Sequence, residues 1–389
     1  MNHITLKNSI INEARRLGFQ LVGITTPNPP AHLEVLWDWL AAGHHAGMAW
    51  MGTERNRQRR ADPKEILPEC QSILALGIAY PGSHISNPAI GDGRIASYAW
   101  GDDYHDVLPA RLKAIVRFIE TQVGASVPNR WYTDTGPILE REIAQRAGLG
   151  WIGKNTCLIS PRAGSYFLLG EILLGIELPP DDPFTIDQCG SCRRCIEACP
   201  TDCILPNRTI DANRCISYLT IEEKGPIPLE LRPQIENWVF GCDICQQVCP
   251  WNLRFAPTAF ETYTGESRFA AQPGRATPTL EDEMALTPEA FNLKFIGSPV
   301  KRTKRRGYLR NVAVALGNSK NLDAIPALRD ALKDSEALIR SHAAWALGQI
   351  GGELAGQILE QALLNERDQT VRDEILDARE LIRSQHKNS

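Results

Sequence analysis

The feature that most constrains this chain is the spacing of its cysteines. Nine of the eleven cysteines lie between positions 189 and 249 of the 389 residues. Seven of them form the run C-x2-C-x2-C-x3-C-P, which ends at Pro200, and the shorter run C-x2-C-x3-C-P, which ends at Pro250. Thiols spaced in this way bind metal in a reducing compartment, whereas disulfide frameworks suit small secreted domains. The spacing therefore predicts a metal-containing domain.

The first run has the spacing of bacterial ferredoxins, in which three thiolates hold one four-iron cluster and the fourth reaches the other cluster. The second run lacks one cysteine, and Cys215 can supply the missing ligand. If the last cysteine of each run crosses over, the ligands fall into two sets. The first set is Cys189, Cys192, Cys195 and Cys249, and the second set is Cys199, Cys215, Cys242 and Cys245.

Two alternatives to this assignment stay open. Zinc also binds pairs of CxxC cysteines, although two runs that end in Cys-Pro favour iron–sulfur clusters. Cys203 is an alternative to Cys215, but it lies close behind Cys199 and would crowd the same turn. Cys70 and Cys157 lie among apolar residues, and we expect them to be packed core thiols.

The overall composition is that of an ordinary globular protein, with 43% hydrophobic residues, 23% charged residues and a net charge of −4. A chain of this length is expected to hold two or three domains. The sequence shows no uninterrupted apolar segment of about 18 residues and no export signal. These features predict a cytoplasmic protein without a membrane span, and the net charge excludes no class of partner.

The segment before the cysteine runs mixes helical and strand-like patterns, which predicts an α+β fold. Predicted helices cover 10–17, 108–123 and 137–147. Apolar, strand-like runs cover 19–24, 70–80, 131–133 and 168–178. Prolines at 177–183 indicate a linker. We therefore expect a mixed α/β domain over 1–180, a cluster domain over 181–255, a connecting segment over 256–300 and a helical domain over 301–389.

The C-terminal part contains an internal repeat. Residues 309–317 (LRNVAVALG) match residues 340–348 (RSHAAWALG), and a weaker third copy begins near Val371. Helical repeats of about this length stack into an α-solenoid. The pattern resembles HEAT-type repeats, although its period is shorter than theirs.

Two motifs of the N-terminal half carry candidate chemistry. Gly148, Gly150 and Gly153 form a literal GxGxxG, but they follow a predicted helix instead of opening one. A dinucleotide site needs a strand before the motif and a helix after it, so we expect these glycines to end a helix and to permit close backbone approach. Asp134, in YTDTGP, precedes a predicted helix. It either caps this helix or acts as a general acid at the edge of a pocket.

Several segments together resemble the epoxyqueuosine reductase family. They are YTDTGP at 132–137, GWIGKNTCLIS at 150–160, GSYFLLGEI at 164–172 and the two cysteine runs. The resemblance extends over nearly the whole chain, including the helical repeats of the family's longer members. It implies a cobalamin-dependent enzyme of tRNA modification that reduces epoxyqueuosine to queuosine at the wobble position of anticodons.

The resemblance also implies cofactors and residue roles. The N-terminal domain would bind cobalamin, with cob(II)alamin as the resting form, and a ferredoxin-like domain with two 4Fe-4S clusters would pass electrons to the cobalt. Asp134 would be the proton donor beside the cofactor, and the corrin surface would include Arg57, Ser97, Asn155 and Ser160. The DxHxxG motif that supplies histidine to cobalt is absent. A flavodoxin or ferredoxin would supply single electrons to a monomeric enzyme.

A basic run opens the helical repeats. Residues 301–310 carry six basic side chains and no acidic one, on a chain of net negative charge. Such a run is either a solvated helix start or a phosphate-binding surface. Anticodon loops are single-stranded, and their bases can be splayed out by a protein. The candidate tRNA-binding residues are Lys301, Arg302, Lys304, Arg305, Arg306 and Arg310.

Two other functions compete with this hypothesis. A reductive dehalogenase has related modules, but such enzymes usually carry a twin-arginine export signal, which the sequence does not show. A ferredoxin-like electron carrier with a docking solenoid would leave residues 1–180 unexplained. A bound corrinoid would separate the electron carrier from the two enzymes, and tRNA binding would separate the reductase from the dehalogenase.

Overall fold

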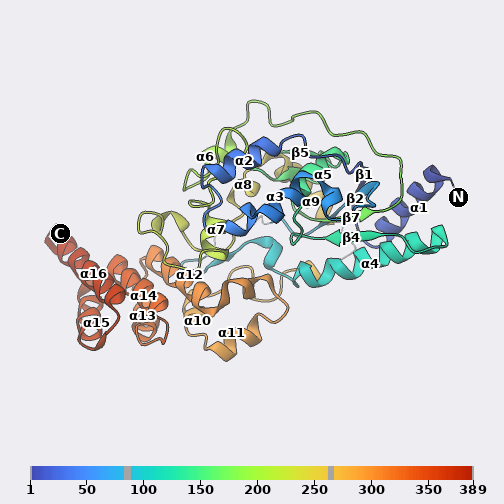
Figure 1. Ribbon diagram of the computed structural model, residues 1–389. Coiled ribbons are helices and arrows are strands. Elements are labelled where there is room, and N and C mark those ends of the chain that lie inside the picture. Colours follow the sequence, from blue (N-terminus) through green and yellow to red (C-terminus); the bar gives the residue numbers. More distant parts are fainter. Residues whose placement is uncertain (1, 83–88, 262–266, 388–389) are drawn as a thin grey trace. The chain divides into compact units, whose positions relative to one another are not determined.

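The computed structural model describes residues 2–82, 89–261 and 267–387 (Figure 1). The chain divides into two compact units, which are both discontinuous in sequence. Unit 1 comprises Met1–Gly82, Gly101–Asn213 and Ile244–Ala270, and unit 2 comprises Ser83–Trp100, Arg214–Asp243 and Ala271–Ser389. The cysteine-rich block is therefore divided between the two units. No helix in the described part of the chain combines the length and apolar character that a membrane crossing requires.

Unit 1 is built on a four-stranded antiparallel sheet (Figure 1). In spatial order its strands are β1 (Leu21–Thr25), β2 (Ser72–Ala79), β7 (Phe167–Leu174) and β4 (Asn129–Tyr132). Every residue of β2 is buried, which is the pattern of a central strand with both faces covered. Ala75 of β2 lies opposite Glu171 of β7, and Tyr132 of β4 lies opposite the same glutamate.

Helices cover both faces of this sheet. They are α1 (His3–Arg16), α4 (Tyr104–Val123) and α5 (Glu140–Arg146). Ile143 of α5 packs in one core with Phe167 and Leu173, whereas Leu112 of α4 lies over Gly170. Successive strand residues point to opposite faces, so α5 covers one face of β7 and α4 covers the other.

The predicted elements of this half are confirmed with shifted ends. The helix predicted from residue 137 begins only at Glu140, because the backbone bends over residues 133–138. The glycine motif follows α5, and the short strand β5 (Trp151–Ile152) lies between its last two glycines, so it does not form a dinucleotide site. Gly150 is required by close packing, because a Cβ there would lie 2.1 Å from the carbonyl oxygen of Ile159.

The cysteine runs form short, loop-rich structure. In unit 1, helices α6 (Arg194–Glu197) and α8 (Ile244–Gln247) pack against each other. β5 pairs with β6 (Leu158–Ile159), and α9 (Pro250–Glu261) begins at the proline that ends the second run. In unit 2, Cys215 precedes α7 (Ile216–Ile221), and Cys242 follows β8 (Trp238–Phe240), which pairs with β3 (Arg94–Ile95).

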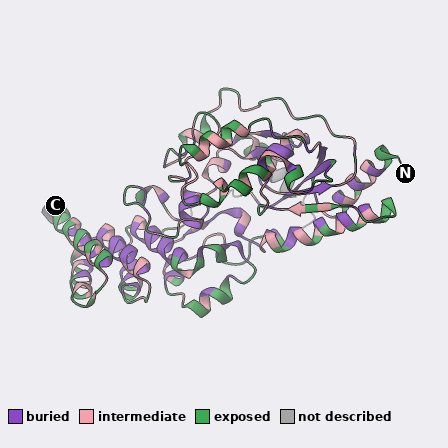
Figure 2. Ribbon diagram, viewed as in Figure 1, coloured by how far each residue is buried: buried purple, intermediate pink, exposed green. Residues whose placement is uncertain are grey.

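The rest of unit 2 is helical. The stretch predicted as a connecting segment contains α10 (Leu280–Met284) and α11 (Pro288–Lys294), and its residues 262–266 lie outside the described residues. The repeats follow as α12 (Lys304–Ser319), α13 (Ile325–Ala331), α14 (Ala337–Ile350), α15 (Gly352–Asn365) and α16 (Gln369–Lys387). Most of α12 and α14 is buried (Figure 2).

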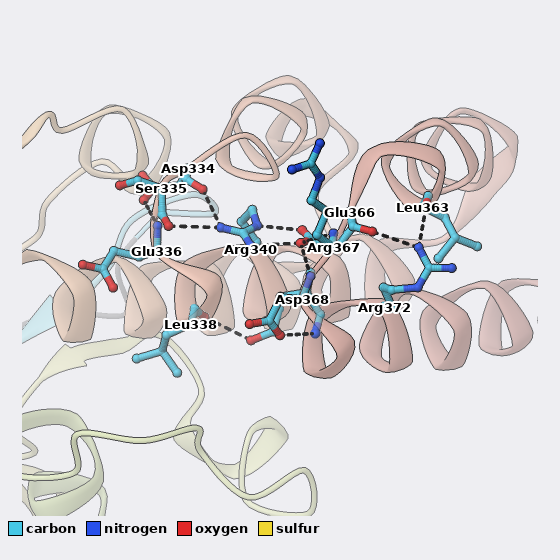
Figure 3. A network of polar contacts seen from close by, with 12 residues as sticks. Asp334, Ser335, Glu336, Leu338, Arg340, Leu363, Glu366, Arg367, Asp368 and Arg372 are labelled. Atoms are coloured by element: carbon cyan, nitrogen blue, oxygen red, sulfur yellow. Dashed lines mark hydrogen bonds and ion pairs between the residues drawn. The ribbon is translucent and has the colours of Figure 1, made fainter.

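The sequence repeat corresponds to helices that stack side by side. α12 packs against α14, and α14 packs against α16. A Cβ on Gly317 would lie 2.8 Å from the Cα of Ala346, and a Cβ on Gly348 would lie 2.9 Å from the Cα of Ala378. The glycine that ends each copy of the repeat therefore allows the close approach of the next helix. Arg340 adds a polar tie between repeats by donating to both carboxylate oxygens of Glu366 (Figure 3).

Candidate functional site

Asp134 lies in the turn between β4 and α5. Its backbone has a φ of 59°, in the left-handed region that residues other than glycine seldom adopt. The turn is held by Thr133, whose hydroxyl donates to the carbonyl of Leu169 at 2.7 Å, and by the N–H of Thr135, which donates to the carbonyl of Thr133. Strain of this kind persists where surrounding contacts impose it, and it is common at functional sites.

Asp134 does not cap α5. Leu139 occupies the N-cap position of that helix and makes no side-chain cap bond. The capping interpretation is therefore wrong, because the helix begins later than its sequence pattern suggested. The side chain of Asp134 is instead 60% exposed, and it faces the first turn of α4.

The first turn of α4 supplies the polar partners of Asp134. The hydroxyl of Tyr104 donates to Asp134 Oδ2 at 2.7 Å, and His105 Nε2 lies 3.5 Å from the same oxygen. The other ring nitrogen of His105, Nδ1, lies 2.8 Å from Asp103 Oδ1. Asp103 caps α4 by accepting the N–H of His105. The helix cap thus orients the imidazole toward Asp134.

This arrangement favours a charged imidazole. Burial opposes the imidazolium, but hydrogen bonds to Asp103 and Asp134, together with the charges of these two carboxylates, raise the pKa of His105 to about 9. At neutral pH both ring nitrogens therefore carry protons and can donate to the two carboxylates. The group can hold and transfer a proton at Asp134 Oδ2, which is the chemistry of a general acid.

The four thiols predicted to hold the first cluster surround one cavity. Cys189, Cys192, Cys195 and Cys249 all line a space of about 250 Å³ in unit 1. Burial and the three neighbouring thiols raise the pKa of Cys195 to about 11. Buried thiols crowded in this way need a cationic group to hold them as thiolates. The donor set and the space therefore fit a 4Fe-4S cluster.

Neighbouring donors complete the surroundings of this cavity. The indole nitrogen of Trp151 lies 3.4 Å from the sulfur of Cys189. The ammonium of Lys154 donates to the carbonyls of Gly190 and Cys192, at 2.7 and 2.8 Å. Lys154 thus fixes the loop of the first run, and Trp151 supplies the kind of N–H···S contact that tunes iron–sulfur clusters.

The second set of cysteines is divided between the two units. Cys199 and Cys245 belong to unit 1, and Cys215 and Cys242 belong to unit 2. The alternative ligand Cys203 is buried, and its sulfur lies 3.5 Å from that of Cys199. The assignment of Cys215 over Cys203 stays a prediction. Cys70 is buried in the core of unit 1, as expected.

Iron content tests this assignment. We expect Cys215→Ser to lose about half of the eight irons that two four-iron clusters require, because it removes a ligand of one cluster. Cys203→Ala should keep all of them, because a neighbouring thiol that is not a ligand is replaced. Iron and acid-labile sulfide would be measured on anaerobically prepared protein. Loss of iron in Cys203→Ala with full retention in Cys215→Ser would reverse the assignment.

The residues proposed for the corrin differ in their surroundings. In unit 1, Asn155 lines the cluster cavity and donates to the carbonyl of Cys245 at 3.3 Å. Ser160 is buried, and Arg57 is exposed with its guanidinium 4.6 Å from the ring centre of Trp37. In unit 2, the buried hydroxyl oxygen of Ser97 has no hydrogen-bond partner among the described residues, as expected of a side chain that awaits a ligand.

The basic run is only partly available to a ligand. Arg310 is fully buried, and its guanidinium donates to the carbonyls of Leu219, Glu223 and Gly225. Burial lowers the pKa of Arg310 to about 10, so the group stays charged at neutral pH. The prediction that Arg310 contacts tRNA is wrong, because all of its donors face backbone carbonyls and the side chain of Asn311.

The other members of the run lie nearer the surface. Arg305 donates to both carboxylate oxygens of Asp334 and to the carbonyl of Leu286, so its main role is structural. Arg302 pairs with Glu222, yet its side chain is half exposed. Arg306 is also about half exposed. Lys301 and Lys304 are exposed and form no ion pair within the described ranges.

Sequence reasoning missed three groups around Asp134. His105 was overlooked, although its place two residues after a capping aspartate was a usable signal. Glu140 and Glu171 were also overlooked. Glu171 lies inside the segment GSYFLLGEI, where a single acid in a buried strand is unusual. Their proximity to Asp134 depends on tertiary contacts that spacing does not reveal.

Three family models match the sequence. Residues 188–252 match the 4Fe-4S double cluster binding domain, residues 60–135 match the domain described as epoxyqueuosine reductase QueG, DUF1730, and residues 305–378 match HEAT repeats. The first match decides between the metals in favour of iron–sulfur clusters over zinc. The third confirms the helical repeats, although their period is short.

Curated proteins and solved structures are similar over almost the whole chain. The epoxyqueuosine reductase of Xanthomonas campestris pv. campestris is 41% identical over 347 residues, which cover 87% of this chain and 94% of the relative. The Escherichia coli K12 enzyme is 39% identical and covers 86% of both chains.

Two solved structures share the fold over almost the whole chain. An epoxyqueuosine reductase in complex with an epoxyqueuosine-modified tRNA-Tyr stem loop has a TM-score of 0.89 at 32% identity, covering 98% of this chain and 100% of its own. The Bacillus subtilis enzyme, described with its Asp134 catalytic loop swung out of the active site, has a TM-score of 0.88 at 32% identity with the same coverage. The predicted combination of an α+β domain, a two-cluster domain and an α-solenoid is thereby confirmed.

Proposed function

Because this chain belongs to the epoxyqueuosine reductase family, whose members are oxidoreductases, we propose that it reduces epoxyqueuosine to queuosine at the wobble position of tRNA anticodons. The observation that carries the proposal is the juxtaposition of Asp134 with Tyr104 and His105 in the same unit as a four-thiol cavity. The reaction consumes two electrons and two protons, and the epoxide oxygen leaves as water. The chain offers groups suited to supply the protons and to hold cofactors that supply the electrons.

We assign the proton to Asp134. The imidazolium of His105, 3.5 Å from Oδ2, would protonate the Asp134 carboxylate, while Asp103 holds the ring in place. The Asp134 carboxyl would then donate this proton to the epoxide oxygen as its carbon–oxygen bond breaks. Tyr104 orients the carboxyl through its hydrogen bond. The exposure of Asp134 lets a substrate reach it from solvent.

We assign the electrons to cofactors held by the two cysteine sets and by the corrin-binding residues. One cluster would be held by Cys189, Cys192, Cys195 and Cys249, and the other by Cys199, Cys215, Cys242 and Cys245. Arg57, Ser97, Asn155 and Ser160 would hold cobalamin. When bound, cobalamin supplies a cobalt centre that can be reduced one electron at a time to a strongly reducing state. Asn155 belongs to the proposed corrin-binding residues and also lines the first cluster cavity.

We assign the tRNA to a surface that includes the basic run. The related crystal structure with a tRNA stem loop supports a tRNA substrate. Lys301, Arg302, Lys304 and Arg306 keep exposed cationic groups that can neutralise phosphates. Arg305 and Arg310 are left out, because their guanidinium groups bind other parts of unit 2.

The salt dependence of tRNA binding tests this surface. We expect the double variant Lys301→Gln/Lys304→Gln to flatten the slope of log K against log salt concentration by about 1.5, since each phosphate contact contributes about 0.7 to 0.9. Lys320→Gln/Lys333→Gln, which removes the same charge elsewhere on the repeats, is the matched control. Equal flattening by both double variants would show that only net charge matters and that the surface is misassigned.

The remaining assignments follow from the sequence. We propose a cytoplasmic monomer that receives single electrons from a flavodoxin or ferredoxin. Residues 1–180 would form the cobalamin-binding catalytic domain, 181–255 the ferredoxin-like domain and 301–389 the tRNA-binding repeats, joined by 256–300. These ranges describe functional segments, since the compact units of the fold combine parts of several of them.

Metal analysis followed by turnover tests the function. Protein prepared anaerobically with cobalamin should contain about eight irons and about one cobalt per chain. With a one-electron reductant it should convert epoxyqueuosine tRNA to queuosine tRNA, detected by mass spectrometry of digested tRNA. Iron without cobalt after reconstitution, and no conversion, would favour the electron carrier. Cobalt with conversion of an aryl halide but not of tRNA would favour the dehalogenase.

A further inference from the structure

A second pair of carboxyl groups, those of Glu140 and Glu171, lies next to Asp134. Glu171 lies on the central strand β7 and is completely buried. Its side chain shares a face of the sheet with Phe167 and Leu173, because side chains two residues apart along a strand point the same way. That face is the apolar core under α5. The function proposed above gives no role to an acid at this place.

Glu171 has no donor to satisfy it. Neither of its carboxyl oxygens has a hydrogen-bond partner among the described residues. Its neighbour is another carboxyl group, that of Glu140 in the first turn of α5. Two neighbouring ionised carboxylates, one of them fully buried in an apolar core, would repel each other strongly. A proton between them removes this repulsion and supplies the missing donor.

The charged groups around the pair favour the same conclusion. The acids Glu140 and Asp134 are the charged groups that act on Glu171. Asp134, Glu171 and the cations Arg141 and Arg60 act on Glu140. Burial first, and then the Glu140 carboxylate, raise the pKa of Glu171 well above its usual range. Burial and the Asp134 carboxylate raise the pKa of Glu140 to about 7.

The pair is connected to Asp134 through the backbone. Glu140 Oε1 accepts the N–H of Asp134 at 2.6 Å, a short distance typical of a charge-assisted bond. This N–H belongs to the residue with a φ of 59°. The bond therefore holds the turn in a conformation that an aspartate would otherwise leave, and it keeps the carboxyl of Asp134 against Tyr104.

We propose that Glu140 and Glu171 share one proton, and that this carboxyl pair positions Asp134 for proton donation in the reaction proposed above. The inference rests on the proposed function for its catalytic consequence, while the shared proton is a property of the resting protein. A fully buried acid whose neighbour is another carboxyl group destabilises a core relative to an apolar residue of similar size. The functional value of the pair must therefore lie in holding the strained turn at Asp134 in place.

The role of each glutamate differs. The shared proton resides mainly on Glu171, which donates it to Glu140 and has no other partner in the part of the chain that the structure describes. Glu140 then keeps its negative charge and presents Oε1 to the N–H of Asp134. Glu140 and Glu171 are positioning residues, because neither touches the substrate.

Infrared spectroscopy and hydrogen exchange test the pair without turnover. The holoenzyme at neutral pH should show the band of a protonated carboxylic acid in an apolar site, and Glu171→Gln should remove it. Glu140→Ala should speed amide exchange in the peptide that contains Asp134 by about 10-fold or more, the factor expected for losing a hydrogen bond to a charged acceptor. Glu142→Gln is the matched control, because Glu142 lies on the same helix, is buried and accepts the N–H of Ala31 at 2.6 Å.

Turnover then tests the catalytic consequence. Glu140→Ala should lower kcat by roughly 10- to 100-fold, the effect of a misplaced reacting group, with unchanged affinity for tRNA. The glutamine side chain of Glu171→Gln can still donate to Glu140, so kcat should stay within about 3-fold of wild type at neutral pH. If kcat of the wild type falls above neutral pH as the pair ionises, this fall should be absent in Glu171→Gln. If Glu140→Ala does not fold, Glu140→Gln replaces it, because the amide keeps the acceptor but not the charge.

The outcomes separate this inference from the function. A missing acid band in the wild type, or a band that Glu171→Gln leaves in place, overturns the shared proton whether or not the enzyme reduces epoxyqueuosine. An unchanged kcat in Glu140→Ala overturns the positioning role. An acid band and altered exchange in a protein that does not convert epoxyqueuosine tRNA would uphold the pair and reject the proposed reaction.

Discussion

Asp134→Asn is expected to lower the rate of queuosine formation by about 10²- to 10⁴-fold, the contribution usual for a general acid. The amide is the same size as the carboxyl, and it can still accept the hydrogen bond from Tyr104 and keep its N–H on Glu140. It cannot give up a proton to a leaving oxygen. Single-turnover conversion of epoxyqueuosine tRNA under a strong reductant would measure the loss, with cobalt and iron contents as checks on the cofactors.

The control for this variant is Asp106→Asn. Asp106 also lies in the first turn of α4, but it is exposed, so its replacement removes the same charge from the same region. We expect it to keep the wild-type rate. A wild-type rate in Asp134→Asn would show that Asp134 is not the donor, and His105, whose imidazolium lies 3.5 Å from Oδ2, would become the next candidate.

The parts that sequence predicts well depend on local pattern. Cysteine spacing predicted which four thiols would share a cavity, because three of them are close in sequence and the ferredoxin pattern brings the last cysteine of the other run to the same cluster. The 31-residue offset between 309–317 and 340–348 likewise predicted stacked helices, since each copy needs its neighbour to bury an apolar face. Strand β2 was visible as an apolar run because both of its faces are covered.

The parts that sequence missed depend on contacts between distant segments. Asp134, Glu140 and Glu171 come from a turn, a helix and a strand, and register alone places Glu171 opposite Tyr132 beside that turn. No periodicity links them. In the basic run the sequence predicted too many ligand-binding residues, because a count of charges along the chain does not show which side chains face the solvent. Arg310 lies on the buried side of α12, while Lys304 at the start of the same helix is exposed.

Arg310→Met is expected to destabilise the repeat helices by about 3–5 kcal/mol, the usual loss when one partner of a buried charged network is removed. Methionine fills a similar volume but leaves the carbonyls of Leu219, Glu223 and Gly225 without their donor. Buried carbonyls without partners carry a large desolvation penalty. Native-state hydrogen exchange of α12 peptides would measure the free energy of the opening reaction.

Two further variants identify the physical origin of the effect. Arg310→Lys should be intermediate, because an ammonium is a compact charge that cannot reach all of the carbonyls that a planar guanidinium spans. Lys304→Met, on the same helix but exposed, should leave exchange unchanged and weaken tRNA binding. The opposite result, in which Arg310→Met keeps wild-type exchange and weakens tRNA binding, would mean that the guanidinium leaves its carbonyls to contact phosphate. Comparing amide exchange and tRNA binding in the Arg310 and Lys304 variants therefore shows whether the positive charge at each position of α12 stabilises the fold or binds tRNA.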